Sequence, residues 1–280
     1  MNLKINLLLS EKEQRVFAWS AATTANARRS TLDARRDSIR LILVLVIYIN
    51  VAGVLDEAPV SRMKDAPLIM LWAWEKHRDL SYIDVTTTGV AFLSCSIHLK
   101  GKEAIIQKRM NPLIVPPRTY LMAVARITTD PIDPPEFSRN LRAEVVDIIV
   151  DLFRNRGVKA IQIDYDALKS ERDFYTVLLR DIRKQLPIDT ALSITALASW
   201  CMYDNWLSEL PVDEVVPMLF RMGPEGIKIL QTLDSGKDFR VSFCRYSVGI
   251  SLDEPIKTLP HGRRIYLWGS ALTPNLMVIL

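Results

Sequence analysis

The chain has 280 residues, 49% hydrophobic and 24% charged, a composition typical of a globular protein with a sizeable core. Its net charge of +4 is scattered, without the basic face that a nucleic-acid partner would require beyond the N-terminal arginines. Three cysteines without a C-x-x-C spacing and three widely separated histidines argue against a zinc site or a disulfide framework. One bridge plus a free thiol stays open for an exported protein, although Cys201 is interpreted as a buried, inert thiol. We expect neither a metal nor an organic cofactor.

The N-terminus has the pattern of a targeting signal. Residues 1–40 form a polar tail that ends in several arginines, and residues 41–55 form an apolar run interrupted only by Asn50. Such a pattern is typical of a secretory signal or a short inner-membrane anchor, and a buried core segment is the alternative. Because the arginines precede the run, the positive-inside rule predicts export, to the periplasm or another extracytoplasmic location. We expect membrane contact through this segment only, with residues 56–66 as a linker to a domain at 67–280.

Eight short apolar segments with strand character are expected in that domain. They are Pro67–Glu75, Gly89–Leu99, Tyr120–Thr128, Val158–Ala167, Thr190–Trp200, Glu214–Gly223, Ser247–Ser251 and Arg264–Trp268. One helix is predicted to start after the N-cap Ser138 and to end at Gly157, and another is predicted to stop at Pro187.

Strands that alternate with helices favour a parallel sheet covered by helices. Eight strands in about 215 residues are near the small end of the (β/α)8, or TIM-barrel, range. No G-x-G-x-x-G or phosphate-binding loop follows any strand, which disfavours a doubly wound open sheet. Only twelve residues follow Trp268, too few for a complete closing unit. The predicted class is α/β, a TIM-barrel-like fold without a full final helix.

The segment VKAIQIDYDA at 158–167 gives the clearest signal of a site. Side chains alternate along a strand, so Gln162, Asp164 and Asp166 share one face. Acids at the carboxyl end of a barrel strand usually belong to the active site. We predict Asp166 as a catalytic acid and Asp164 as the neighbour that adjusts its pKa.

Glycoside hydrolysis needs carboxyl groups on both sides of the scissile bond, and two acids on one strand lie too close together for that. A second catalytic acid is therefore expected from another strand, with Glu75, Asp253 and Glu254 as candidates. The alternative is structural: the two aspartates cap the following helix or pair with Arg126 or Arg221, and Glu75 is an ordinary surface residue.

Further side chains at predicted strand ends suit substrate binding. Trp200, Trp268 and an indole beside Glu75 offer platforms for a sugar ring, and core packing is the alternative. Arg221 is predicted to bind a substrate carboxylate or to hold an active-site aspartate, and a structural ion pair is the alternative. Gln162 and Glu254 complete the predicted substrate-binding set.

Six stretches occur together and in order: LWAWE (71–75), VPPRTYLMAVARI (115–127), VKAIQIDYDA with SERDFY (170–175), ALSITALASWC (191–201), VDEVVPMLFRMG (212–223) and CRYSVGISLDEP (244–255). Together they resemble bacterial domain of unknown function family 3142, which is grouped with glycoside-hydrolase-like TIM barrels. The resemblance runs from Pro67 to about Trp268 and implies the fold. The activity of that family is not established, so the resemblance names no reaction.

A narrower likeness links the segment VKAIQIDYDA at 158–167 to the fourth-strand motif of family-eighteen chitinases, D-x-x-D-x-D-x-E. Lys159, Gln162, Asp164 and Asp166 fall at its four acidic positions, and only Asp164 matches. Asp in place of the terminal Glu withdraws the carboxyl group by about one methylene, which puts substrate-assisted chitin cleavage in doubt. What survives is a neighbouring pair of carboxylates, one of which can be held protonated.

The sequence thus predicts a glycoside-hydrolase-like barrel that acts by carboxylate acid/base chemistry on a carbohydrate, such as a cell-envelope glycan. Two alternatives remain: a non-catalytic carbohydrate-binding barrel, and an envelope structural protein on a degenerate barrel. The fold alone does not choose among them.

Overall fold

The computed structural model describes residues 62–154, 157–254, 256, 259 and 261–269. The predicted tail and the predicted signal or anchor at 41–55 lie outside the described residues. Within the described ranges, no helix is long and apolar enough to cross a membrane.

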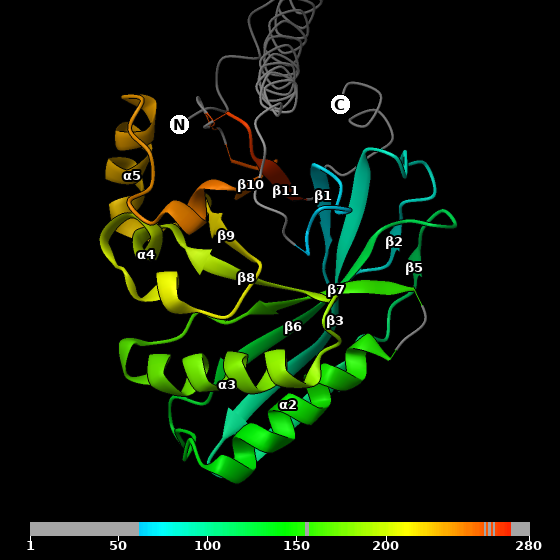
Figure 1. The fold of residues 1–280 in the computed structure, drawn as a ribbon, viewed down its shortest axis with the longest axis vertical. Helices are drawn as coiled ribbons and strands as arrows, with labels where there is room; N and C mark the ends of the chain where they lie inside the picture. Colours follow the sequence, from blue (N-terminus) through cyan, green and yellow to red (C-terminus); the bar gives the residue numbers. More distant parts are fainter. Residues whose placement is uncertain (1–61, 155–156, 255, 257–258, 260, 270–280) are drawn as a thin grey trace, which may run out of the picture.

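Eight parallel strands close into a barrel (Figure 1). In order around the ring they are β1 (Ile69–Ala73), β3 (Thr88–Lys100), β6 (Leu121–Thr129), β7 (Val158–Asp164), β8 (Ala191–Leu197), β9 (Glu214–Met218), β10 (Ser247–Ser251) and β11 (Arg264–Trp268). β1 pairs in parallel with both β3 and β11, which closes the ring. The TIM-barrel-like fold class predicted from the sequence is confirmed.

The connections from β1 to β3 and from β3 to β6 contain strands that the sequence pattern did not predict. β4 (Glu103–Lys108) turns back at Gly101 and pairs antiparallel with β3, while β2 (Arg78–Asp79) and β5 (Leu113–Ile114) form a small separate sheet. Most of β4 is exposed, so it lacks the apolar alternation that marks a half-buried strand.

The helices lie outside the barrel. Figure 1 shows α2 (Arg139–Phe153) and α3 (Arg172–Gln185) side by side, whereas α4 (Ala198–Tyr203) and α5 (Gly226–Asp234) follow β8 and β9. The Ser138 hydroxyl accepts from the Leu141 amide at 3.2 Å, so the predicted N-cap of α2 is confirmed. Single turns of 3-10 helix are η1 (Lys169–Glu171), η2 (Trp206–Glu209), η3 (Gly223–Glu225) and η4 (Ser242–Arg245).

Strand alternation divides the apolar residues into two cores. Outward-facing side chains of the strands pack against the helices in the larger core. The smaller core fills the barrel with inward-facing residues such as Met70, Trp72, Val216 and Tyr266. A Cβ on Gly249 would lie only 2.5 Å from the Trp72 ring, so the absence of a side chain there lets this indole occupy the barrel centre.

A buried carboxylate ties the amino-terminal half of the barrel together. Glu214 accepts hydrogen bonds from Ser193, Ser247 and Tyr266, and its Oε1 lies 2.6 Å from Nη1 of Arg264. These partners come from β8, β10 and β11, on both sides of β9. The network compensates the cost of burying the charge and links four strands.

We expect Glu214→Gln to lower the free energy of unfolding by about 3 kcal/mol, because the Arg264 cation would then be buried without a carboxylate. Urea denaturation followed by circular dichroism measures the loss. Glu209→Gln is the control, since Glu209 is exposed on η2. Equal stability of the two variants would contradict this role for the network.

Candidate active site

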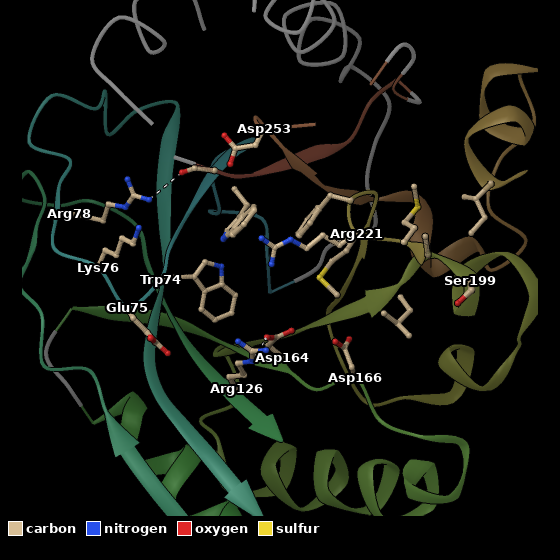
Figure 2. Close-up of a pocket in the computed structure, with 18 residues that line it drawn as sticks. Trp74, Glu75, Lys76, Arg78, Arg126, Asp164, Asp166, Ser199, Arg221 and Asp253 are labelled. Atoms are coloured by element: carbon tan, nitrogen blue, oxygen red, sulfur yellow. Dashed lines mark hydrogen bonds and ion pairs between the residues drawn. The ribbon is translucent and has the colours of Figure 1, made fainter. Parts of the chain in front are cut away.

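A pocket of about 530 Å³ opens at the carboxyl ends of the barrel strands (Figure 2). Its lining comes from strand ends and the loops after them: Trp74, Glu75, Lys76, Arg78, Arg126, Asp164, Asp166, Leu197, Ala198, Ser199, Met218, Phe220, Arg221, Met222, Ile229, Asp253, Trp268 and Gly269. All four acids predicted to be catalytic line this one pocket. The same end carries the active sites of TIM-barrel enzymes.

Asp164 is the last residue of β7 and is buried at the base of the pocket. One carboxylate oxygen accepts a hydrogen bond of 2.7 Å from the Thr195 hydroxyl of β8, and the other lies 3.7 Å from Nε of Arg126 on β6. Burial raises the pKa of Asp164, while the Thr195 hydrogen bond and the Arg126 charge lower it. The predicted structural pairing of this acid with Arg126 is therefore present within the site.

Asp166 lies two residues further along and is exposed to the pocket. Partial loss of hydration, followed by the charge of Asp164, raises its pKa to about 6, although Arg126 acts in the opposite direction. A carboxyl group with this pKa can hold a proton near neutral pH and still meet a ligand. Because its pKa is raised in the folded state, Asp166 favours folding below a pH of about 4, and this contribution is lost as the pH rises through 6.

The other predicted acids lie on different strands from the aspartate pair. Glu75 follows β1 and Asp253 follows β10, and both are exposed at the pocket wall. In Figure 2, Asp253 lies on the far side of the pocket from Asp164 and Asp166. Glu254 is outside the lining, and its carboxylate accepts from the Arg221 amide at 3.2 Å. The arrangement offers carboxyl groups from three parts of the barrel mouth.

Aromatic rings form one wall of the pocket. Trp268 at the end of β11 stacks on Phe220 with ring centroids 5.6 Å apart and planes within 4°. The Arg221 guanidinium carbon lies 4.4 Å from the Trp268 ring centroid, and Arg126 lies 5.8 Å from the Trp74 ring centroid. Partly exposed aromatic rings beside acids and guanidinium groups are suited to sugars.

Besides Glu254, two more of the predicted substrate-binding residues lie outside the pocket lining. Gln162 has no exposed surface, because its amide accepts from the Trp72 indole at 2.8 Å and donates to the Ser193 hydroxyl at 3.0 Å inside the barrel. Trp200 lies in α4, since β8 ends at Leu197, and it packs against Trp206 in the outer core. Both placements differ from the sequence interpretation: Gln162 has no exposed surface, and Trp200 does not line the pocket.

Several lining residues had no sequence signal as functional groups. Lys76 lies between β1 and β2, Arg78 begins β2, and Phe220 follows β9. None of them belongs to a recognisable motif. Ser199 lies in the first turn of α4. Only the turn after each strand shows which of these side chains point inward. No group of three or more His, Cys, Asp or Glu in the described part of the chain is arranged to hold a metal ion.

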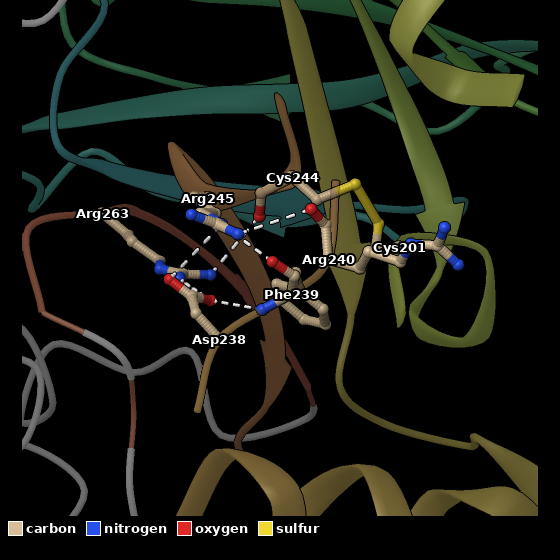
Figure 3. The surroundings of a disulfide bond; sticks show 7 residues. All are labelled: Cys201, Asp238, Phe239, Arg240, Cys244, Arg245 and Arg263. Carbon is tan, nitrogen blue, oxygen red and sulfur yellow. Dashed lines mark hydrogen bonds and ion pairs between the residues drawn. A yellow bond between two sulfur atoms is a disulfide. The ribbon is translucent and has the colours of Figure 1, made fainter. Parts of the chain in front are cut away.

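Cys201 and Cys244 form a disulfide with a Cα–Cα distance of 5.8 Å (Figure 3). The interpretation of Cys201 as an inert thiol is therefore wrong, and the alternative of one bridge plus a free thiol holds for the described cysteines. Cys95 is the free, buried thiol, and burial raises its pKa to about 11. The bridge joins α4 to η4, beside the buried Arg263 that pairs with Asp238.

The residues that carry the aspartate pair lie inside a recognised family region. Residues 121–217 match the family model "Domain of unknown function (DUF3142)". This DUF3142 region starts at the first residue of β6 and ends within β9, and it confirms the predicted resemblance. No curated protein matches the chain at a significant level.

The solved structures similar to the chain include two spore cortex-lytic enzymes SleL. The one from Bacillus cereus has 16% identity and a TM-score of 0.40, over 65% of this chain and 49% of that one. The one from Bacillus megaterium QM B1551 has 12% identity and a TM-score of 0.43, over 65% and 50%. The chain thus spans about half the length of these structures.

Asp164 and Arg126 should shift the Asp166 pKa in opposite directions. Asp164→Asn removes a neighbouring negative charge and is expected to lower the pKa from about 6, while Arg126→Gln removes a positive charge and should raise it. Carbon-13 NMR titration of the Asp166 carboxyl group measures both shifts. Asp189→Asn, a change at an exposed residue outside the pocket, is the control. A wild-type pKa near 4 would contradict the described electrostatics.

The disulfide closes a sequence separation of 43 residues, for which chain entropy predicts about 4 kcal/mol of stabilisation. We expect Cys201→Ser to lower the free energy of unfolding by about 2–4 kcal/mol under oxidising conditions. Addition of a reductant should destabilise the wild type similarly and leave the variant unchanged. If reductant destabilised the Cys201→Ser variant as much as the wild type, the effect would not come from this bridge.

Proposed function

We propose that this protein hydrolyses a glycosidic bond, with Asp166 as the general acid. The observation that carries the proposal is the position of Asp166: it is exposed in a pocket at the carboxyl end of a barrel, beside the buried Asp164, and its pKa is raised to about 6. This environment gives a carboxyl group that is both accessible and able to donate a proton.

In the proposed reaction, Asp166 donates its proton to the glycosidic oxygen as the bond from that oxygen to the anomeric carbon breaks. A carboxylate from another strand, Asp253 or Glu75, accepts a proton from the water that adds to the anomeric carbon. Alternatively, that carboxylate attacks the anomeric carbon and forms an ester, which water then cleaves as the deprotonated Asp166 takes the proton of the water and the carboxylate leaves. Asp164, held by Thr195 and Arg126, is a positioning residue that keeps the pKa of Asp166 raised. The chemistry proposed here needs no cofactor.

An extracytoplasmic substrate such as a cell-envelope glycan is part of the proposal. The Cys201–Cys244 disulfide supports it, because structural disulfides persist mainly in oxidising compartments. The arginine-flanked apolar segment at 41–55 supports it too, as an export signal or membrane anchor. We propose no nucleic-acid partner, and membrane contact only through that segment.

A carbohydrate-binding barrel without catalysis is the second candidate. Asp166 stands where the chitinase motif has Glu, and its shorter side chain reaches less far towards a scissile bond. The stacked Trp268 and Phe220 rings would serve binding alone equally well. A purely structural role is less well supported, because the barrel mouth holds an open pocket of about 530 Å³.

Reducing-end release from purified peptidoglycan strands and chitin oligosaccharides tests the proposal. We expect Asp166→Asn to lower the rate at least about 100-fold, the usual contribution of a positioned general acid. Wild-type activity should fall as the pH rises through about 6, because Asp166 then loses its proton. Asp189→Asn is the matched control, since this exposed acid lies outside the pocket.

Full activity of Asp166→Asn would rule out this residue as the acid. Tight binding of a glycan by the wild type without any release of reducing ends would instead support the non-catalytic candidate.

A further inference from the structure

Arg221 occupies a position in the pocket that its structural contacts do not explain. Figure 2 shows its side chain extending into the pocket towards Trp74. The residue is exposed, and no carboxylate of the described residues lies within ion-pair distance of its guanidinium group. Its guanidinium carbon lies over the Trp268 ring instead, 4.4 Å from the centroid. A cation held on a ring face keeps its hydrogen-bond donors free for a ligand.

The backbone at Arg221 is fixed in an unusual conformation. Its φ angle of 51° lies in the left-handed region, which is unfavourable for a residue with a long side chain. The amide is anchored by Glu254, whose carboxylate accepts from it at 3.2 Å. Such conformations persist where the surroundings hold them, and they gather at ligand sites. Here the conformation directs the side chain over Trp268.

The charge balance of the pocket also favours an anionic ligand. Four cations line it: Lys76, Arg78, Arg126 and Arg221. Four carboxyl groups line it as well, but the proposed acid carries a proton in the active state, so the cations are then in excess. Arg126 is already paired with Asp164 at 3.7 Å, whereas Arg221 remains available.

We propose that the Arg221–Trp268 pair forms a subsite for a sugar that bears a carboxylate. This inference rests on the proposed carbohydrate function and names its substrate class. The pyranose ring would lie against the partly exposed wall formed by Trp268 and Phe220, and the planar guanidinium would bind the carboxylate through two hydrogen bonds. Two sources share this chemistry: a hexuronic acid, and an amino sugar with a lactyl ether.

Binding measurements by calorimetry separate this proposal from catalysis. The ligands are an oligouronate and its carboxyl-reduced neutral counterpart, and glycan strands with a lactyl ether and their carboxyl-reduced form. All are measured with the Asp166→Asn protein, which prevents turnover during titration. We expect at least one acidic ligand to bind about tenfold or more tightly than its neutral partner, as a charge-assisted bidentate contact implies. The preferred acid identifies the source.

Arg221→Asn should abolish this preference and leave the neutral ligand nearly unaffected. Asn tolerates the left-handed backbone conformation, so the substitution removes the guanidinium with little strain. Arg221→Lys should keep only part of the preference, because the ammonium cannot form the bidentate contact. Arg240→Asn is the matched control, since Arg240 is exposed and lies outside the pocket.

Equal affinity for acidic and neutral ligands, or a preference that survives Arg221→Asn, would overturn the subsite. An acid preference that depends on Arg221 would uphold it even if the wild type cleaved neither ligand. In that case only the proposed hydrolysis would fail.

Discussion

Closure of the parallel barrel is the constraint on which the site depends. Pairing of β1 with both β3 and β11 fixes the register of the ring, and every second residue of a strand must then face the interior. Along β7 this places Ala160, Gln162 and Asp164 at successive heights inside the barrel. Ala160 is buried by packing and Gln162 by packing and hydrogen bonds, whereas Asp164, nearest the carboxyl end, reaches the pocket. A shift by one residue would replace Asp164 with an apolar neighbour.

The same geometry explains why the two buried acids, Glu214 and Asp164, have different roles. Glu214 lies near the amino-terminal end, where Arg264 and three hydroxyl groups hold it within the barrel. Asp164 lies at the other end with a single hydroxyl partner and a more distant guanidinium. The carboxylate of Glu214 therefore has its charge and its hydrogen-bonding capacity satisfied inside the barrel. Asp164 leaves its neighbour Asp166 exposed to solvent and electrostatically perturbed, which is the condition for chemistry.

Strand positions could be predicted from the sequence because apolar runs and flanking turn residues repeat along the chain. β10 and β11 begin and end at the predicted residues, and the alternation in 158–167 placed Asp164 and Asp166 on the pocket side. Gln162 shares that face, but alternation gives no height within the barrel. Trp200 was misplaced because small and apolar residues continue from β8 into α4 without a break. The partner of Cys201 was not predictable, since it depends on how the loop after α5 folds back.

A crystal structure of the Asp166→Asn protein with a bound acidic oligosaccharide tests the central claim most directly. The account predicts a sugar ring against Trp268, its carboxylate on Arg221, and a glycosidic oxygen about 3 Å from the residue-166 side chain, the hydrogen-bonding distance needed for proton transfer. A ligand bound away from the carboxyl ends of the strands, or one whose glycosidic oxygens all lie beyond reach of that side chain, would contradict it.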